Sequence, residues 1–297
     1  MQRVFGALFF CFCITHLTNG QSKEHFRIEK EGEGDQLIHF HFNSPSGTSF
    51  IKVTSDEDPV NIYGHIDRSK TKSMFYDREI GVDKHVYLDL EESTQNSFSS
   101  SVSFGMLSDK KGNENDWKIY LSKSNEFGLD LNYGLGKADI DLSGLATKRL
   151  NLNSGSADVV LGYQEGFSNG TSMDTMNIKM GFGSVLLMNA NLAKAKQLIA
   201  DIGFGNLRMD LSDEEVHEGK VKASIGAGSL TVNVPKSGVP VKVVINNSPL
   251  CRVKFAKGFQ EIERNVFINK AYQSDSESAL LFNLDVALGS ITFQNKP

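Results

Sequence analysis

The sequence has few of the residues that cross-link, kink or anchor a chain. Its 297 residues include 3 cysteines and 6 prolines. Cys11 and Cys13 lie in the first apolar run, so Cys251 has no partner for an internal disulfide in the remainder of the chain. After that first run, no apolar stretch approaches the length that crosses a bilayer. We therefore expect a fold held together by buried apolar side chains, with no integral membrane segment in its mature form.

Neither sign of charge dominates the sequence. Its 36 acidic residues slightly outnumber its 31 basic ones, and the two kinds are interspersed. Nucleic-acid binding requires clustered Lys and Arg side chains, so we expect no nucleic-acid partner. Two catalytic signatures, G-x-S-x-G and H-E-x-x-H, do not occur either. Charge and motifs therefore give no reason to predict an enzyme.

Three G-x-G turns, in GFGSVL, GFGNLR and GAGSLT, are candidates for phosphate binding. Each lacks the third glycine of a dinucleotide-binding turn. Each also opens a strand, whereas a phosphate site of that kind opens a helix whose N-terminus holds the anion. We therefore interpret the turns as structural and expect no cofactor.

The first 20 residues have the features of a secretory signal peptide. A basic start over residues 1–3 precedes the apolar run of residues 4–14, and Thr18 and Gly20 are the small residues before a cut ahead of Gln21. We expect cleavage at that point and export to the periplasm, the cell surface or the extracellular space.

Glycine turns and alternating apolar residues recur together in one repeated pattern. Six segments share it: LDLNYGLGKADIDL, LNLNSGSADVVL, MNIKMGFGSVLLM, LIADIGFGNLRMDL, VKASIGAGSLTVNV and FNLDVALGSITF. Their aligned turn glycines are Gly136, Gly155, Gly183, Gly205, Gly228 and Gly289. The first five are 19 to 28 residues apart, a spacing typical of one coil of a β-solenoid.

Apolar residues fill equivalent positions on both sides of the glycine. Two residues after it stand Ala138, Ala157, Val185, Leu207, Leu230 and Ile291. Three residues before it stand Tyr133, Leu152, Met180, Ile202, Ile225 and Val286. Alternation with a period of two puts such residues on one face of a strand. Inward residues stand at odd distances before the glycine and at even distances after it. This interruption of the alternation predicts a corner at the glycine, which reaches positive φ at little cost. We therefore predict an all-β fold, a single-stack β-solenoid whose coils share one core.

The repeats divide the mature chain into two parts. Residues 116–297 carry the repeats. Residues 21–115 form irregular β-strands continuous with the solenoid, as expected for end coils that must blunt an exposed sheet edge. No linker separates a second domain.

The last two turn glycines are 61 residues apart, too far for a single coil. We place a degenerate coil between them, with Cys251, Val253 and Phe255 facing inward and Pro249 at the corner. Cys251 is then a small core residue rather than a reactive thiol.

Five outward aspartates are the main candidates for chemistry, because polysaccharide-cleaving β-helices use such carboxylates as acids, bases or Ca²⁺ ligands. They are Asp139, Asp141, Asp158, Asp201 and Asp210. Equivalent positions in other repeats hold threonine, asparagine or glutamine, so no carboxylate row follows the stack. We interpret them as a solvated face and predict no catalytic residues. An enzyme acting on anionic polysaccharide is the alternative function.

His39 and His41 lie two residues apart on one strand face, a spacing compatible with a metal ion. A third ligand is not indicated, because His65 and His85 come from separate segments. We interpret the pair as solvent-facing and predict no metal site.

Val160, Leu186 and Met188 are apolar at outward positions that are polar in most repeats. If the second and third repeats are adjacent, the three side chains form one apolar patch. Two interpretations stay open. A neighbouring segment covers the patch (residues 166–175, residues 191–196 or the N-terminal strands), or it is a docking surface for an envelope protein or a second copy of this chain.

Three stretches of the repeat region resemble a known family. YGLGKADIDLSGLATKRLNLNSGSADVVL and SIGAGSLTVNVPKSGVPVKVVIN resemble the bacterial toast-rack domains, which are related to the LiaF-like, cell-wall-active antibiotic response proteins. GFQEIERNVFINKAY followed by LDVALGSITF is similar to the end of that family's repeat. The resemblance covers residues 117–293 and implies a β-solenoid without catalytic residues.

The LiaF-like relatives are membrane-tethered and damp envelope-stress signalling. This chain departs from them by its signal peptide and by the lack of a tether, which leaves a link to the envelope-stress response in doubt. The resemblance and the composition together predict an exported, non-catalytic binding or scaffold protein of the cell envelope, similar to an adhesin.

Overall fold

The computed structural model describes residues 22–30, 36–92, 115–212, 219–235, 238–247, 249–273 and 279–295. The predicted signal peptide, residues 1–20, lies outside them. The strands of the first part are β1 (Ser22–Ile28), β2 (Ile38–Thr54), β3 (Val60–Ile66), β4 (Thr71–Ile80), β5 (Asp83–Glu92), β6 (Asp116–Ser122), β7 (Glu126–Asp141) and β8 (Ala146–Gly162). Those of the second part are β9 (Met173–Met188), β10 (Ala195–Asp210), β11 (Gly219–Val234), β12 (Val241–Asn247), β13 (Cys251–Lys254), β14 (Phe259–Glu263), β15 (Val266–Asn269) and β16 (Leu280–Asn295).

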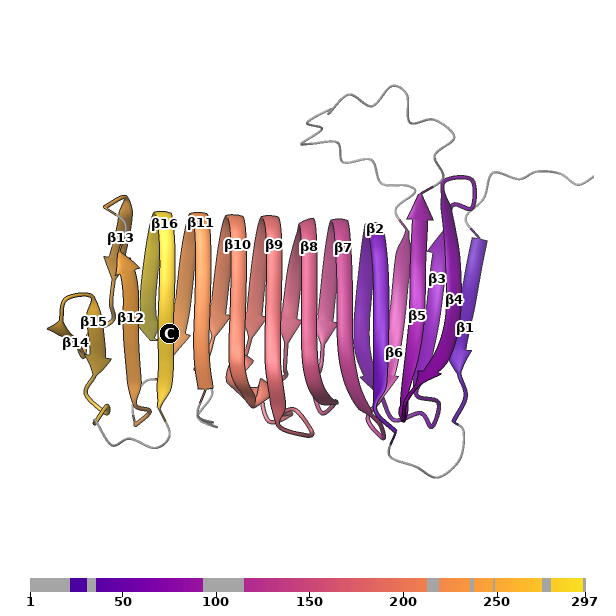
Figure 1. Cartoon of the computed structure of the whole chain (residues 1–297), viewed down its shortest axis with the longest axis horizontal. Helices are drawn as coiled ribbons and strands as arrows, with labels where there is room; N and C mark the ends of the chain where they lie inside the picture. Colours follow the sequence, from indigo (N-terminus) through magenta and orange to yellow (C-terminus); the bar gives the residue numbers. More distant parts are fainter. Residues whose placement is uncertain are drawn as a thin grey trace, which may run out of the picture.

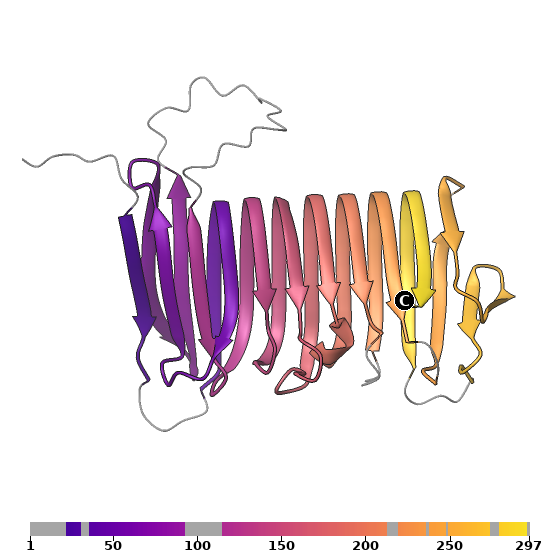
Figure 2. The same ribbon diagram turned by 180° about the vertical axis from the view of Figure 1, so that it is seen from behind.

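These strands form one all-β, single-stack β-solenoid, as predicted. Each long strand arches over along one edge of the stack, so that its first half lies in one layer and its second half in the layer behind (Figures 1 and 2). The long strands pair in parallel in the order β2-β7-β8-β9-β10-β11-β16. A short 3-10 helix, η2 (Ala190–Ala193), packs in the connection between β9 and β10.

The core lies between the two layers, where the alternating apolar residues of both halves meet. Every residue of the two aligned positions is at most 5% exposed. Because coils stack in register, each inward side chain packs on its equivalent in the next coil. The solenoid therefore has one continuous core rather than a core for each repeat.

Most coils require glycine at their corner. The φ angles of Gly136 and Gly205 are +124° and +151°, values that residues with a side chain rarely adopt. A Cβ on Gly205 would lie 1.9 Å from the carbonyl oxygen of Gly183 in the neighbouring coil. The change of inward parity at the glycine is thus confirmed, and close stacking adds a second reason for glycine.

The alignment of the second repeat was wrong by two residues. Gly136 pairs with Ala157, and Gly155 instead stacks on Gly134, the first glycine of the preceding turn. Ala157 therefore occupies the corner of β8, without a positive φ. A shift of two residues preserves the side-chain alternation. For this reason the residues assigned inward in this repeat are still buried, although each belongs one inward position earlier in the coil.

The placement of the degenerate coil was also wrong. β16 inserts between β11 and β12, so the irregular coil β12–β13 lies beyond β16 and not between the two regular coils. The C-terminal label inside the stack in Figure 1 reflects this insertion. Cys251 pairs with Gly289 and stands at the corner in place of Pro249. Only a regular coil can extend the stack in register, and the irregular one is left to close its end.

At the N-terminal end of the stack, too, a regular coil is inserted between the regular stack and irregular outer strands. β2 is a regular coil with Gly47 at its corner, where φ is +123°. It inserts between β7 and the outer strands β5 and β6. Antiparallel strands finish both layers, β4 on β5 and β1–β3 on β6. The antiparallel pairs β14–β15 and β12–β15 do the same at the other end. Both ends thus replace a regular parallel edge with short irregular strands.

No helix in the described ranges has the length and hydropathy that a membrane span requires.

Candidate binding surface

Stacking in register arranges the outward side chains in rows that run along the solenoid, across the strands. One such row contains Phe50, Asp139, Val160, Leu186, Arg208, Thr231 and Thr292. Any surface feature that spans several coils must therefore be described row by row, since neighbours along a row are far apart in sequence.

The structure brings the three residues of the predicted apolar patch close together. Val160 and Leu186 are direct partners across β8 and β9, and Met188 lies two residues beyond Leu186. Met188 is 41% exposed, and the other two side chains are half-buried. Gly162 pairs with Met188, and a Cβ on Gly162 would lie 2.2 Å from the Met188 carbonyl oxygen. The second and third repeats are thus adjacent, as the patch required.

A second apolar feature did not emerge from the sequence. The residue just before the corner position faces outward in each of the long strands and forms a row that we call the corner ridge: Ser46, Leu135, Ser156, Phe182, Phe204, Ala227 and Leu288. Its four large side chains, Leu135, Phe182, Phe204 and Leu288, are 51–59% exposed. Its sign in the sequence was the large apolar residue before the corner glycine in GLG, GFG and ALG. This residue stands where the alternation of inward and outward positions is interrupted.

A shallow groove of about 620 Å³ runs beside the corner ridge over β2, β7, β8, β9 and β10. Its floor is main chain, because the outward position before the ridge holds Pro45 or glycine: Pro45, Gly134, Gly155, Gly181 and Gly203. A Cβ on Gly134 would lie 2.1 Å from the Pro45 carbonyl oxygen, and one on Gly203 would lie 2.7 Å from that of Gly181. The close stacking of the coils therefore keeps this floor free of side chains at its four glycines.

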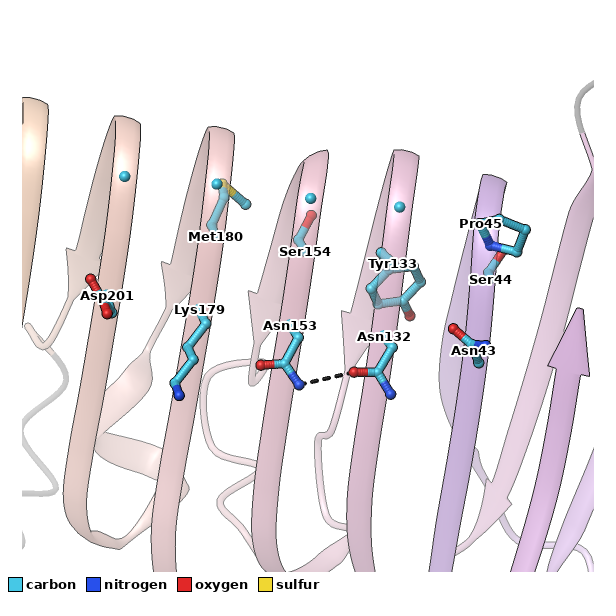
Figure 3. Close-up of a pocket in the computed structure, with 14 residues that line it drawn as sticks. Asn43, Ser44, Pro45, Asn132, Tyr133, Asn153, Ser154, Lys179, Met180 and Asp201 are labelled. Atoms are coloured by element: carbon cyan, nitrogen blue, oxygen red, sulfur yellow. Dashed lines mark hydrogen bonds between the residues drawn. The ribbon is translucent and has the colours of Figure 1, made fainter. Parts of the chain in front are cut away.

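The wall of the groove opposite the ridge is polar. It is one row, with Asn43, Asn132, Asn153, Lys179 and Asp201 on successive coils. Figure 3 shows the three asparagines on the same side of neighbouring strands. The Asn153 Nδ2 group donates a hydrogen bond of 2.9 Å to Asn132 Oδ1. The row carries one cation and one anion side by side, so it has no net charge.

The side chains beneath the floor are buried and uncharged. Tyr133 packs in the core, and its hydroxyl accepts a hydrogen bond of 2.9 Å from Ser49 Oγ. Burial raises the pKa of Tyr133 far above its usual value, so the phenol keeps its proton. The groove therefore offers main chain and apolar contacts at its floor, beside the amides, Lys179 and Asp201 of its wall.

The five outward aspartates do not converge on one site. Asp139, Asp158 and Asp201 lie in three different rows, and Asp201 is on the opposite layer from the other two. Asp141 and Asp210 share a fourth row, with the coils of Gly162 and Met188 between them. The five aspartates therefore form no single carboxylate row along the stack.

His39 and His41 lie on the outward face of β2, where they are half-buried, and the expectation that His85 lies apart from them was wrong. β5 pairs in parallel with β2 and places His85 beside both residues. His85 stacks on His39 with ring centroids 4.4 Å apart, and its Nδ1 atom lies 3.0 Å from His41 Nε2. Burial lowers the pKa of His41, and it lowers the pKa of His85 as well. Among the residues that the structure describes, no group of three or more His, Cys, Asp or Glu side chains is arranged to hold a metal ion.

The sequence also matches a family model. The model described as the N-terminal domain of toast_rack, DUF2154, covers residues 19–188, more than half of the chain. The chain belongs to the toast-rack family. The match to this toast-rack domain includes β1 to β9, and so takes in the N-terminal strands that lie outside the resemblance found over residues 117–293.

Three solved structures are similar to this toast-rack chain. A candidate cell adhesion protein from Clostridium sporogenes is 18% identical, with a TM-score of 0.43 over 93% of this chain and 100% of its own. A candidate adhesin from Bacteroides fragilis is 10% identical, with a TM-score of 0.35 over 93% and 98%. A candidate lipid binding protein from Parabacteroides distasonis is 9% identical, with a TM-score of 0.32 over 93% and 95%. None of the curated proteins matches the toast-rack chain by sequence.

Proposed function

We infer that this protein is an exported, non-catalytic binding module that acts at the cell surface in the manner of an adhesin. The observation that carries the proposal is the corner ridge, which holds large apolar side chains at 51–59% exposure along a regular stack. Soluble proteins seldom expose aligned apolar side chains without a binding role. Membership of the toast-rack family and the dispersed carboxylates support the non-catalytic part of the proposal.

Cell binding tests the main proposal. The fluorescently labelled mature chain is incubated with intact cells of its source, and a Phe182→Ser, Phe204→Ser variant serves for comparison. We expect saturable retention of the wild type and at least tenfold less of the variant. Absence of retention would contradict the proposal. New chain ends in a panel of anionic polysaccharides would favour the alternative, a carbohydrate-active enzyme.

Export is tested separately in the organism that makes the protein. The tagged full-length chain is recovered from cell fractions and from the medium, and its N-terminus is sequenced. We expect the chain outside the cytoplasm to begin at Gln21. An intact Met1 on all recovered protein would contradict both the cleavage and the proposed location.

The patch of Val160, Leu186 and Met188 is proposed as a second contact surface, for an envelope protein or a second copy of the chain. The variant Leu186→Ser, Met188→Ser should keep the melting temperature of the monomer and lose self-association in analytical ultracentrifugation or capture of an envelope partner. Thr231→Ala, in the same row as Leu186, is the matched control. A clear drop in melting temperature for the double variant would show that another segment of the chain covers the patch.

A further inference from the structure

We propose that the groove beside the corner ridge binds a neutral, linear oligosaccharide that lies across the coils from β2 to β10. The proposal rests on the proposed binding function and names the class of its ligand. It follows from the length of the groove, from its amide wall (Asn43, Asn132 and Asn153, in a row without net charge) and from an aromatic rim, the Phe182–Phe204 pair of the adjoining corner ridge.

The length of the groove suits an extended polymer. It spans five coils, and neighbouring strands lie about 4.8 Å apart, so its axis extends roughly 19 Å. Over β7 to β10 the floor is the main chain of glycine, and on β2 it is Pro45. A linear chain of several sugars can therefore lie along the floor, whereas a compact small molecule would occupy only one or two coils.

The amide wall presents equivalent hydrogen-bonding groups at successive levels. Asn43, Asn132 and Asn153 stand on adjacent coils, and each amide supplies two donor hydrogens and an acceptor oxygen. The bond from Asn153 to Asn132 leaves the Asn132 amide nitrogen and the Asn153 oxygen for a ligand. Sugar hydroxyls both donate and accept, so such a row matches them without requiring charge on either side.

The aromatic rim supplies the apolar contact that a sugar ring needs. Phe182 and Phe204 stack on each other, with centroids 5.2 Å apart and planes inclined by 10°. The outer faces of the two rings therefore point along the ridge, toward Ser156 on one side and Ala227 on the other. The small Ser156, on β8 within the span of the groove, leaves space over the outer face of Phe182, whereas Ala227 stands on β11, beyond the groove. The electron-rich face of an aromatic ring attracts polarised C–H groups, such as those on the apolar side of a pyranose.

Other classes of ligand fit the groove less well. A peptide that adds a strand needs an unpaired sheet edge, and the coils beneath the groove are paired on both sides. An anionic polymer needs a cationic row, but Lys179 stands beside Asp201. A lipid chain needs an apolar surface on both sides, and here a row of polar side chains from Asn43 to Asp201 follows the whole length of the groove. Neutral carbohydrate is the class that the wall, the rim and the floor share.

Calorimetric titration of the mature chain tests the proposal directly. The probes are cellohexaose, chitohexaose and maltohexaose as neutral chains, hexagalacturonate as an anionic chain, and phosphatidylcholine vesicles. We expect at least one neutral hexamer to bind, and the corresponding disaccharide to bind at least tenfold more weakly because it spans fewer coils. Binding only of hexagalacturonate or only of vesicles would overturn the proposal, as would no binding of any neutral hexamer.

Variants of exposed residues locate the site. Phe182→Ala, and separately Asn132→Ala with Asn153→Ala, should weaken the binding of the hexamer at least tenfold. Leu288→Ala is the matched control, because Leu288 belongs to the same ridge with 51% exposure but stands on β16, outside the groove. Full binding by both test variants would show that the sugar binds elsewhere. If cells retain the protein while no neutral hexamer binds, the ligand class is wrong and the proposed function stands. If retention fails as well, both fail.

Discussion

Replacement of one corner glycine should destabilise the whole stack. Gly205→Ala introduces a side chain at φ +151°, which costs about 1–3 kcal/mol of backbone strain. The new Cβ would also lie 1.9 Å from the Gly183 carbonyl oxygen, so β9 and β10 must separate locally. Loss of one or two main-chain hydrogen bonds adds about 1–2 kcal/mol. A total of about 2–5 kcal/mol corresponds to a melting temperature lower by roughly 5–15 °C.

Two further glycines separate the contributions of strain and contact. Gly144 has a φ of +76°, and a Cβ added there would meet no heavy atom within 4 Å beyond its chain neighbours, so Gly144→Ala introduces strain alone. Gly155 has no positive φ and would bring its Cβ to 3.0 Å from the Gly134 carbonyl oxygen, so Gly155→Ala introduces a mild contact alone. Melting is followed by circular dichroism. If Gly205→Ala melts no lower than either control, the combination of strain and contact is not what holds the corner.

Two other perturbations test the assignment of layers and the histidine cluster. Leu207→Asp places an unpaired charge at a position that is 1% exposed, so this variant should unfold. Asp139→Ala, on the outer face, should leave the urea denaturation midpoint unchanged. The reverse result would mean that inside and outside are exchanged. The lowered pKa values of His41 and His85 mean that the unfolded chain binds more protons below the ordinary value of 6.5, so stability should fall as the pH drops from 7.5 toward 5. The urea midpoint of the wild type should fall over this pH range, and that of the double variant His41→Gln, His85→Gln should fall less. Equal dependence of the midpoint on pH in the two proteins would rule out the histidines as the source.

The inside of each coil was predictable because it depends on local alternation. A residue such as Leu207 or Val232 has apolar neighbours two positions away on the same strand, and this pattern survives any register of stacking. The error at Gly155 illustrates the limit of such alternation. A shift by two residues leaves every side chain on its own face, so alternation alone cannot distinguish Gly155 from Ala157 as the corner.

The surface features were less predictable, because they form across coils. The patch was anticipated because Leu186 and Met188 break a polar pattern within one strand. The corner ridge was not, since Phe182 and Phe204 stand at the parity break, where alternation assigns no face. The groove depends on the close approach of Gly181 to Gly155 in the neighbouring coil. These two residues are far apart in the sequence, so no local pattern predicts their contact.

The sequence by itself determined the β-solenoid, its inward residues and five of the six aligned glycine corners, since these follow from a period of two and from the φ angles that glycine permits. Only the tertiary structure decided the order of the coils. β2 and β16 leave their places in the chain order to join the regular stack, and irregular strands close both ends. The physical reason is that a regular coil gains most from two regular neighbours, while an exposed edge is safest when short and irregular. That balance is settled between segments distant in the chain, and no local pattern records it.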